Sequence, residues 1–362
     1  PWRMVSFLEC RNVLLEDVTL RNSPAYTVWP CGCDDVRIRG IRLFNNLRGP
    51  NTDGIDPDCS SNVTISDCII ECGDDCIALK SDADRLGRAK ACENVTVTNC
   101  VLTTTCCAIR VGYEGDAPIR NCTFSNLVIA RSRTGINMLV PRHAEAGIHH
   151  GPTIENIRFS NLVMDTTIPI YLWIGDDASA PGAIRNVSIS DCFATTERAC
   201  YIGGAKHLPI EDVRISNFRL EVRGETDDEF SAEVPYPYRV WDYFNKKGIP
   251  HGFYCRHVRG LEFHDVRVAW GKVSGPWRSA LRAEQIEDLD LHGFVARQAP
   301  GPADAPAIHL TDARGVSLRG CRAAPGTGTF LRLDGPAAGR ASLSGNDLAA
   351  AKTEMDRIGA AP

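Results

Sequence analysis

One short phrase recurs along the chain and constrains its fold more than any other feature. Each copy has two polar residues, an alternating apolar run, a short Asn, Asp or Gly turn, and a second alternating run. The clear copies are RNVLLEDVTL at 11, DDVRIRGIRL at 34, SNVTISDCII at 61, ENVTVTNCVL at 93, RNCTFSNLVI at 120, ENIRFSNLVM at 155, RNVSISDCFA at 185 and EDVRISNFRL at 211. Weaker copies follow as RGLEFHDVRV, EDLDLHGFVA and RGVSLRGCRA.

Alternation with a period of two, in β-branched residues, predicts strands. The clear copies begin 23 to 35 residues apart, which is too short for a unit that also contains a helix. Hairpin signals such as Asn-Gly are scarce, which disfavours an ordinary sandwich. We therefore expect an all-β chain folded as a right-handed parallel β-helix of about eleven coils, stacked about 4.8 Å apart.

This fold would form a single domain over residues 1–362. The period breaks at about residues 222–258, a stretch rich in aromatics, Pro and charge, which we interpret as a long loop insertion. The chain begins with Pro1 rather than Met and the repeat starts almost at once, so we interpret its N-terminus as processed or truncated.

The charge balance restricts the classes of partner. The chain carries 40 basic and 45 acidic side chains, a formal net charge of −5. Without a basic excess we expect no nucleic-acid partner, and no apolar run is long enough to predict a membrane span. We expect a monomer.

The sixteen cysteines have two interpretations. They could form a disulfide framework, as in small secreted proteins. However, Cys68, Cys100, Cys122 and Cys192 recur at one place in the repeated phrase. This regularity favours small thiols stacked in a core.

The repeated phrase also contains four Asn-X-Ser/Thr matches, at Asn62, Asn94, Asn121 and Asn186. Glycosylation is one interpretation of this pattern. We favour a second interpretation, in which each Asn lies at a repeated turn and its side-chain amide stacks along the column.

Aligning the coils places distant residues in one column. The alignment rests on the isoleucines that follow TDG, DDC, CCA and RTG, namely Ile55, Ile77, Ile109 and Ile136. It puts Asp53 directly below Asp75, with Cys107 and Thr134 above them, and Asp74 one residue to the side. Asp56 and Asp58 are expected to lie towards the outside.

Two stacked carboxylates with a third beside them repel one another and raise at least one pKa. The three acids could be solvated turn residues, or an oxygen-only site for calcium. We favour a catalytic cluster, because adjacent perturbed acids are typical of active sites.

The acid motif itself, NTDG at 51 followed by GDDCIALKSD at 73, resembles glycoside hydrolase family 28, the polygalacturonase group of right-handed parallel β-helices. Later stretches such as PIYLWIG, PGAIRNVSISD and HGFYCRHVRGLEFHDV extend the similarity over most of the chain. The resemblance implies that Asp74 is the general acid. It implies that Asp53 and Asp75 hold and activate the attacking water.

The resemblance implies an inverting hydrolase acting on a pectin-type or related plant polysaccharide. Such an enzyme separates its acid and base carboxyl groups by about 6.5–9.5 Å to admit water. No metal or other cofactor is implied. An extracellular or periplasmic location follows from the family alone.

Two family elements are replaced in this chain. The Gly-His-Gly segment falls on Cys106-Cys107-Ala108, and the Arg-Ile-Lys segment falls on Asn137-Met138-Leu139. Arg110 and Lys80 are in outward columns one coil apart, so two cations are expected to face the cleft. The predicted substrate contacts are Asn51, Lys80, Cys107, Arg110, Asn137 and Arg142.

Two other functions remain open on the sequence. A β-helix lyase would cleave uronates by β-elimination, usually with calcium or a Lys or Arg base. The absence of Lys and Arg from the acid column itself argues against it. A catalytically inactive glycan-binding or structural β-helix would explain the replaced family elements.

Overall fold

The computed structural model describes residues 2–140, 151–175, 182–226, 248–301, 304–335 and 341–358. Within these ranges almost every regular element is a β-strand, and the one helix is the short α1 (Ala83–Leu86). None of the described helices is long and apolar enough to cross a membrane. The all-β class predicted from the repeat is confirmed.

The chain divides into two compact units, Pro1–Cys192 and Phe193–Pro362. The single-domain interpretation stays a prediction. The first unit contains β1 (Val5–Leu8), β2 (Arg11–Glu16), β3 (Thr19–Arg21), β4 (Val28–Cys31), β5 (Asp34–Arg39), β6 (Arg42–Phe44), β7 (Ser61–Ser66), β8 (Ile69–Cys72), β9 (Ile77–Ser81), β10 (Cys92–Thr98), β11 (Val101–Thr104), β12 (Cys107–Gly115), β13 (Ile119–Val140), β14 (Thr153–Ile174) and most of β15 (Ala183–Thr196). The second contains β16 (Cys200–Gly203), β17 (Ile210–Glu225), β18 (Phe253–Ser274), β19 (Leu281–His292), β20 (Val295–Ala296), β21 (Pro306–Thr311), β22 (Arg314–Arg319), β23 (Arg322–Ala323), β24 (Thr327–Asp334), β25 (Ser342–Ser344) and β26 (Ala351–Ile358).

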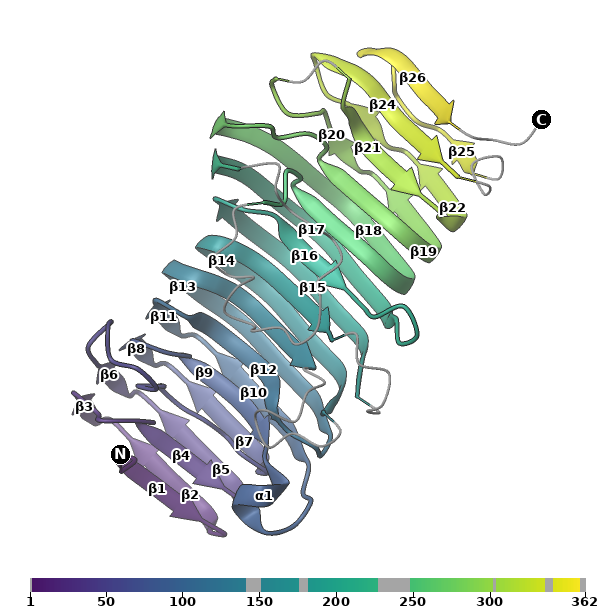
Figure 1. Cartoon of the computed structure of the whole chain (residues 1–362). Helices are drawn as coiled ribbons and strands as arrows, with labels where there is room; N and C mark the ends of the chain where they lie inside the picture. Colours follow the sequence, from purple (N-terminus) through teal and green to yellow (C-terminus); the bar gives the residue numbers. More distant parts are fainter. Residues whose placement is uncertain are drawn as a thin grey trace. The chain divides into compact units, whose positions relative to one another are not determined.

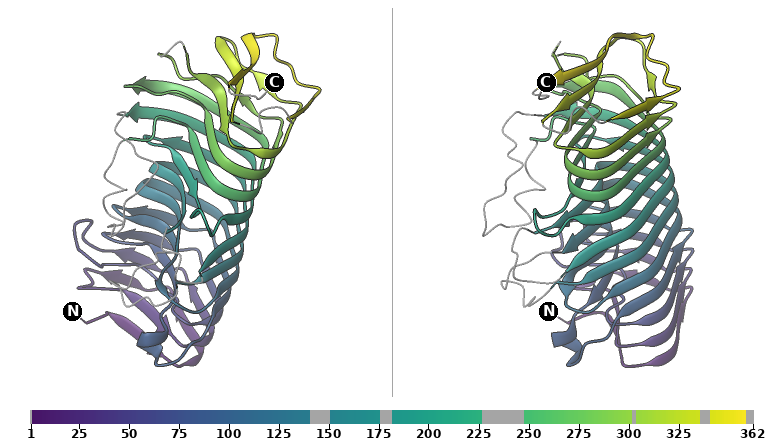
Figure 2. Two further views of the ribbon diagram at one scale, coloured as in Figure 1. Left: turned by 45° about the vertical axis from the view of Figure 1, so that its right-hand side comes forward. Right: turned by 90° about the vertical axis from the view of Figure 1, so that its right-hand side faces the viewer.

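In the first unit the repeated phrases pair in parallel, each with the phrase one coil away. β7 pairs with β10, β10 with β13, and β13 with β14, as the stacked strands of Figures 1 and 2 show. One column runs through Val63, Val95, Cys122 and Ile157, all buried. The period-two pattern therefore indicates which side chains face the core. Burial of each Val or Ile side chain stabilises the fold by about 1.5–3 kcal/mol.

The cysteine prediction is confirmed. All sixteen cysteines lie in the described ranges and each is a free thiol, fifteen of them buried. The four repeated ones, Cys68, Cys100, Cys122 and Cys192, are at most 2% exposed. A small apolar thiol fits a tightly stacked core, where it behaves as a hydrophobic residue.

A ladder of asparagine side chains marks the turn at the start of the repeated phrase. The amide of Asn94 donates to Asn62 Oδ1 at 3.1 Å, and that of Asn156 donates to Asn121 Oδ1 at 3.0 Å. These residues have φ near +56°, a left-handed conformation that Asn tolerates better than most residues. The stacked-amide interpretation is confirmed for this turn.

The second unit repeats the same arrangement. β17, β18, β19 and β22 pair in parallel, and one column runs through Val213, Leu261, Leu289 and Val316. β17 continues to Glu225 and β18 begins at Phe253, so the loop predicted at about 222–258 is shorter than expected at both ends. Most of the loop, residues 227–247, lies outside the described ranges.

Candidate active site

The isoleucine alignment that predicted the acid column is confirmed. Ile55 bridges to Ile77, Ile77 pairs with Ile109, and Ile109 pairs with Ile136. The backbone N–H of Gly54 donates to the carbonyl of Asp75 at 2.8 Å. The residues of the NTDG and GDDC segments therefore lie beside each other on adjacent coils.

Two glycines allow this close approach. A Cβ on Gly54 would lie 2.3 Å from the carbonyl oxygen of Cys76, and one on Gly73 would lie 2.4 Å from that of Gly49. Thr52 links the same two turns, because its hydroxyl donates to Gly49 O at 2.7 Å and accepts from Gly73 N at 3.0 Å. The glycines of both motifs are thus needed for packing around the acids.

Asp53, Asp74 and Asp75 form one cluster. One oxygen atom from each carboxylate lies within 4.8 Å of the others. Asp53 and Asp75 are each 3% exposed, whereas Asp74 is only partly buried. Their closest oxygen atoms lie nearer together than the about 6.5–9.5 Å that separates the carboxyl groups of an inverting enzyme, because these carboxylates belong to adjacent residues and adjacent coils.

Arg110 holds Asp75 from the next coil. Its Nε and Nη2 donate to the two oxygen atoms of Asp75, the second at 3.2 Å, and the N–H of Cys107 donates to Oδ1 at 3.3 Å. Burial is the largest influence and raises the pKa of Asp75, but Arg110, Lys80 and the hydrogen bonds to the carboxylate together outweigh it and lower that pKa below its usual value. Asp75 is therefore ionised around neutral pH.

Lys80 forms ion pairs with acids of neighbouring coils. Its Nζ lies 3.5 Å from Asp53 Oδ2, 3.9 Å from Asp56 Oδ2 and 3.1 Å from Glu114 Oε1, and donates to the hydroxyl of Tyr26 at 3.3 Å. Burial opposes its charge, but the surrounding acids raise the pKa of Lys80 well above its usual value. Lys80 is thus a permanent buried cation.

The pKa values of the remaining two acids rise. Burial, opposed by Lys80, raises the pKa of Asp53 to about 7. Burial and then the negative charge of Asp75 raise the pKa of Asp74. The N–H of Asn51 donates to Asp74 Oδ2 at 3.1 Å, which fixes the orientation of this carboxyl group. The cluster therefore combines an ionised carboxylate with two groups that hold protons more readily.

The expectation that Asp56 and Asp58 lie towards the outside is wrong. Both are fully buried. Asp58 accepts from Trp29 Nε1 at 3.2 Å and from the N–H of Asp82 at 2.9 Å. Burial and then the charge of Asp53 raise the pKa of Asp56 well above its usual value. Trp29 and Asp82 thus contact Asp58, and Lys80 lies 3.9 Å from Asp56.

Lys80 and Arg110, predicted to face the cleft, are almost fully buried. They are 3% and 4% exposed and are paired with acids. Among the other predicted substrate contacts, Cys107 and Asn137 are at most 1% exposed, and the Cys107 thiol accepts from Arg110 Nη2 at 3.3 Å. Asn51 is exposed, and Arg142 lies outside the described residues.

Sequence reasoning missed Tyr26 and Glu114 as members of the site. Tyr26 belongs to an earlier coil and touches Lys80 across 54 residues of sequence. Glu114 lies within an irregularity of the pairing between β12 and β9, where the register shifts between Val111 and Gly115. The repeat gave no signal there, because counting along the phrase fails across a bulge.

Two groups of side chains in the described ranges could hold a metal ion: the three clustered aspartates, and Asp75 with Cys106 and Cys107. Arg110 already lies against the second group, within 3.7 Å of both sulfur atoms. A bound calcium ion would neutralise the charge of these aspartates. Lys80 beside Asp53 and Arg110 beside Asp75 already do so. This arrangement disfavours the calcium interpretation of the cluster.

Similar proteins point to one family. A "Probable polygalacturonase" of Vitis vinifera is 26% identical over 264 residues, covering 69% of this chain and 50% of that protein. A polygalacturonase of Arabidopsis thaliana is 30% identical over 241 residues, covering 62% of this chain and 51% of that protein. The chain spans about half the length of these relatives.

A solved structure agrees with the sequence relatives. The hyperthermoactive exopolygalacturonase from Thermotoga maritima superposes with a TM-score of 0.54 at 27% identity, over 61% of this chain and 50% of that one. The model of "Glycosyl hydrolases family 28" matches residues 2–234, well over half of the sequence. The chain therefore belongs to glycosyl hydrolases family 28.

Proposed function

We propose that the chain is an inverting glycoside hydrolase that cleaves a pectin-type or related polysaccharide in the manner of a polygalacturonase. The observation that carries this proposal is a cluster of three carboxyl groups in unequal surroundings: one oxygen of each lies within 4.8 Å of the others, Asp75 is paired with Arg110, and Asp74 is only partly buried. A glycosidase needs one carboxyl group that donates a proton and another that accepts one. The family relatives support the same chemistry.

Asp74 is the proposed general acid. It is the least buried of the three, so a glycosidic oxygen can reach it. Its raised pKa keeps a proton available, and the neighbouring Asp75 charge maintains that state. Once Asp74 has given its proton to the leaving oxygen, the ionised Asp75 stabilises the positive charge that develops on the sugar ring.

Asp53 is the proposed base that takes a proton from the attacking water. Its Oδ2 faces Lys80, whereas its buried Oδ1 accepts no hydrogen bond from the described residues. Both oxygens of Asp75 accept hydrogen bonds from Arg110. Asp53 is therefore the better proton acceptor, and Asp75 orients the water and supplies charge. Lys80 and Arg110 act as positioning residues through these carboxylates.

The burial of Asp53 and Asp75 favours inversion over retention. In a retaining enzyme a carboxylate attacks the sugar carbon directly. At 3% exposure neither side chain presents an oxygen for that contact, whereas a water molecule is small enough to lie between them and a bound sugar. Inversion is thus proposed on accessibility rather than on the distance between carboxylates.

The lyase alternative receives less support. The acid column itself contains no Lys or Arg, since Arg110 pairs with Ala78 and Asn137, but Lys80 and Arg110 contact the acids from beside that column. Both cations are nonetheless poor bases, because the acids around each raise its pKa well above its usual value.

Further features stay proposals. These are the right-handed β-helix of about eleven coils, a monomeric state, and an extracellular or periplasmic location. Asn51 and Arg142 are the proposed direct contacts with substrate. The burial of Cys107 and Asn137 disfavours such a contact for them.

The test compares release of new reducing ends from galacturonan, rhamnogalacturonan and a neutral glycan. The variants are Asp74→Asn and the matched control Asp67→Asn. Asn at 74 keeps the acceptor for the Asn51 N–H, and Asn at 67 suits a turn with φ of +58°. We expect Asp74→Asn to lose about 10²–10⁴-fold in kcat, and Asp67→Asn to match wild type. Near-normal activity of Asp74→Asn would refute the assignment.

A further inference from the structure

The second unit contains a pocket of about 580 Å³ that none of the proposed chemistry uses. The residues that matter in its lining are Arg267, Trp270, Arg297, Arg322 and Asp347. We call it the arginine pocket. Arg267 of β18 pairs with Val295 of β20, which pairs with Arg322 of β23, so the pocket crosses three successive coils. Its volume is within the usual range for small-molecule sites.

The three arginines of the pocket have no ion-pair partner among the described residues. Elsewhere in this unit arginines are commonly neutralised: Arg319 contacts Asp290 at 2.7 Å, and Arg332 contacts Asp356 at 3.1 Å. The pocket lining adds a single acid, Asp347. Three arginines and one acid in the lining leave an excess of positive charge, which favours an anion.

Trp270 adds an aromatic surface with a fixed position. Its Nε1 donates to the carbonyl of Arg297 at 2.9 Å. Its ring packs edge-to-face on Trp277, which is fully buried, with 5.6 Å between centroids. A ring held from its N–H and by a neighbouring ring loses little entropy on binding. The apolar C–H face of a sugar can pack on such a ring.

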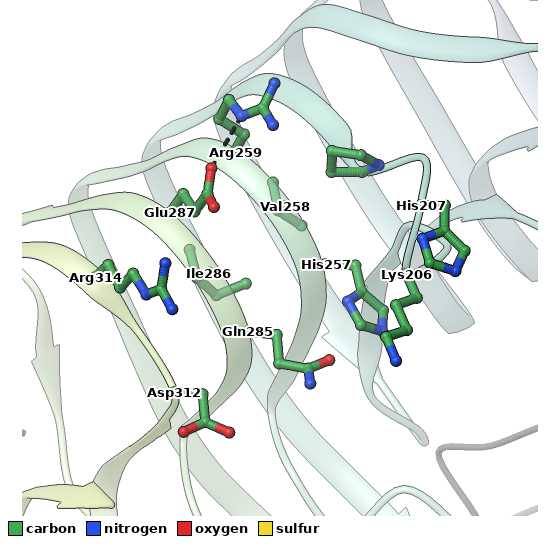
Figure 3. Close-up of a pocket in the computed structure, with 11 residues that line it drawn as sticks. Lys206, His207, His257, Val258, Arg259, Gln285, Ile286, Glu287, Asp312 and Arg314 are labelled. Carbon is green, nitrogen blue, oxygen red and sulfur yellow. Dashed lines mark hydrogen bonds and ion pairs between the residues drawn. The ribbon is translucent and has the colours of Figure 1, made fainter. Parts of the chain in front are cut away.

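A second pocket in the same unit makes a useful comparison. It has a volume of about 440 Å³, and Figure 3 shows its lining. There Arg259 is already paired with Glu287 at 3.0 Å and Glu211 at 2.9 Å. Lys206 and Arg314 have no ion-pair partner among the described residues, but the lining holds two acids, Glu287 and Asp312, against three cations, so its excess of positive charge is smaller. The lining contains no Trp, Tyr or Phe.

We propose that the arginine pocket is an accessory binding site for a carboxylate-bearing saccharide. The guanidinium groups would donate bidentate hydrogen bonds to the carboxylates, and a sugar face would pack on Trp270. The choice of a uronate as the ligand rests on the proposed function. The site itself rests on the unpaired arginines and the anchored tryptophan.

The experiment is calorimetric titration of the full chain carrying Asp74→Asn, so that the ligand is not consumed. The probes are a short oligogalacturonate, a neutral oligogalactan, inorganic phosphate and a single-stranded oligonucleotide. Three further variants are made in the Asp74→Asn protein: the double variant Arg267→Ala with Arg322→Ala, the single variant Trp270→Ala, and the control Arg314→Ala. These arginines are exposed, so the thermal midpoint should not move.

We expect a binding event for oligogalacturonate that weakens about tenfold or more in the double arginine variant and in Trp270→Ala, and stays within about twofold in Arg314→Ala. The neutral oligogalactan should give no such binding event. Unchanged binding in the double variant would overturn the proposal. So would a stronger response to phosphate or to the oligonucleotide, which would make the pocket a general anion site. Absence of hydrolysis by wild type would refute the proposed function alone, because this binding needs no turnover.

Discussion

The buried ion pair between Arg110 and Asp75 predicts a specific response to the substitution Arg110→Met. Methionine keeps much of the side-chain length but removes both donors to Asp75. The two partners are only 4% and 3% exposed, so the carboxylate left behind cannot be solvated. Removing one member of such a pair costs about 3–5 kcal/mol, because an uncompensated charge stays buried.

The pH dependence of this loss has a definite sign. In the wild type the folded pKa of Asp75 is lowered, so its stabilising contribution is present above the unfolded pKa of about 3.9 and is lost as pH falls through the folded pKa. Without Arg110, burial raises the folded pKa above the unfolded value. Asp75 then destabilises the fold as pH rises. The difference between variant and wild type should therefore be larger at pH 7 than at about pH 4.

The assay is urea unfolding followed by tryptophan fluorescence at both pH values. Arg314→Met, at an exposed arginine without an ion pair among the described residues, is the control and should change stability by less than about 0.5 kcal/mol. The double variant Asp75→Asn with Arg110→Met should be more stable than Arg110→Met at pH 7, because neither charge of this pair remains buried. A loss below about 1 kcal/mol at pH 7 for Arg110→Met would refute the reasoning.

Three further predictions follow from the same structure. Lys80→Met should move the acidic limb of the kcat/KM profile to higher pH, because Lys80 lowers the pKa of Asp53 from an even higher value; an unmoved limb would contradict the role of this contact. Asn121→Ala should cost about 1–2 kcal/mol in urea unfolding, and Asn121→Gly about 1 kcal/mol less than that, because glycine accepts φ of +56° without strain; equal losses would show that the backbone conformation does not matter. Titration with a thiol reagent, without reductant, should find all sixteen thiols in the unfolded chain and very few in the native one; a shortfall after unfolding would indicate disulfides.

The repeat made the path of the chain predictable. Each phrase forms one coil, so its inward residues stack on those of the next, and Ile55, Ile77 and Ile109 align as counting along the sequence predicts. The same counting brought Asp53 and Asp75 together across 22 residues of sequence. Both results depend only on the period of the strand and the length of the turns.

The surroundings of the acids could not be predicted in this way. Alternation tells whether a side chain points into the coil or away from it, but not what covers the side that points away. Asp56 therefore looked exposed, although Lys80 and neighbouring groups bury it. Lys80 reaches Tyr26 and Glu114 across 54 and 34 residues, and no local pattern encodes these contacts.

The most direct test of the proposed reaction is time-resolved proton NMR of wild-type protein with galacturonan. One spectrum series distinguishes hydrolysis, elimination and binding without turnover. The proposed mechanism predicts a new reducing end whose first-formed anomer has the configuration opposite to that of the cleaved bond. Retention of configuration would contradict attack by a water held between Asp53 and Asp75. Signals of an unsaturated product, or no product from any uronate polymer, would contradict hydrolysis itself.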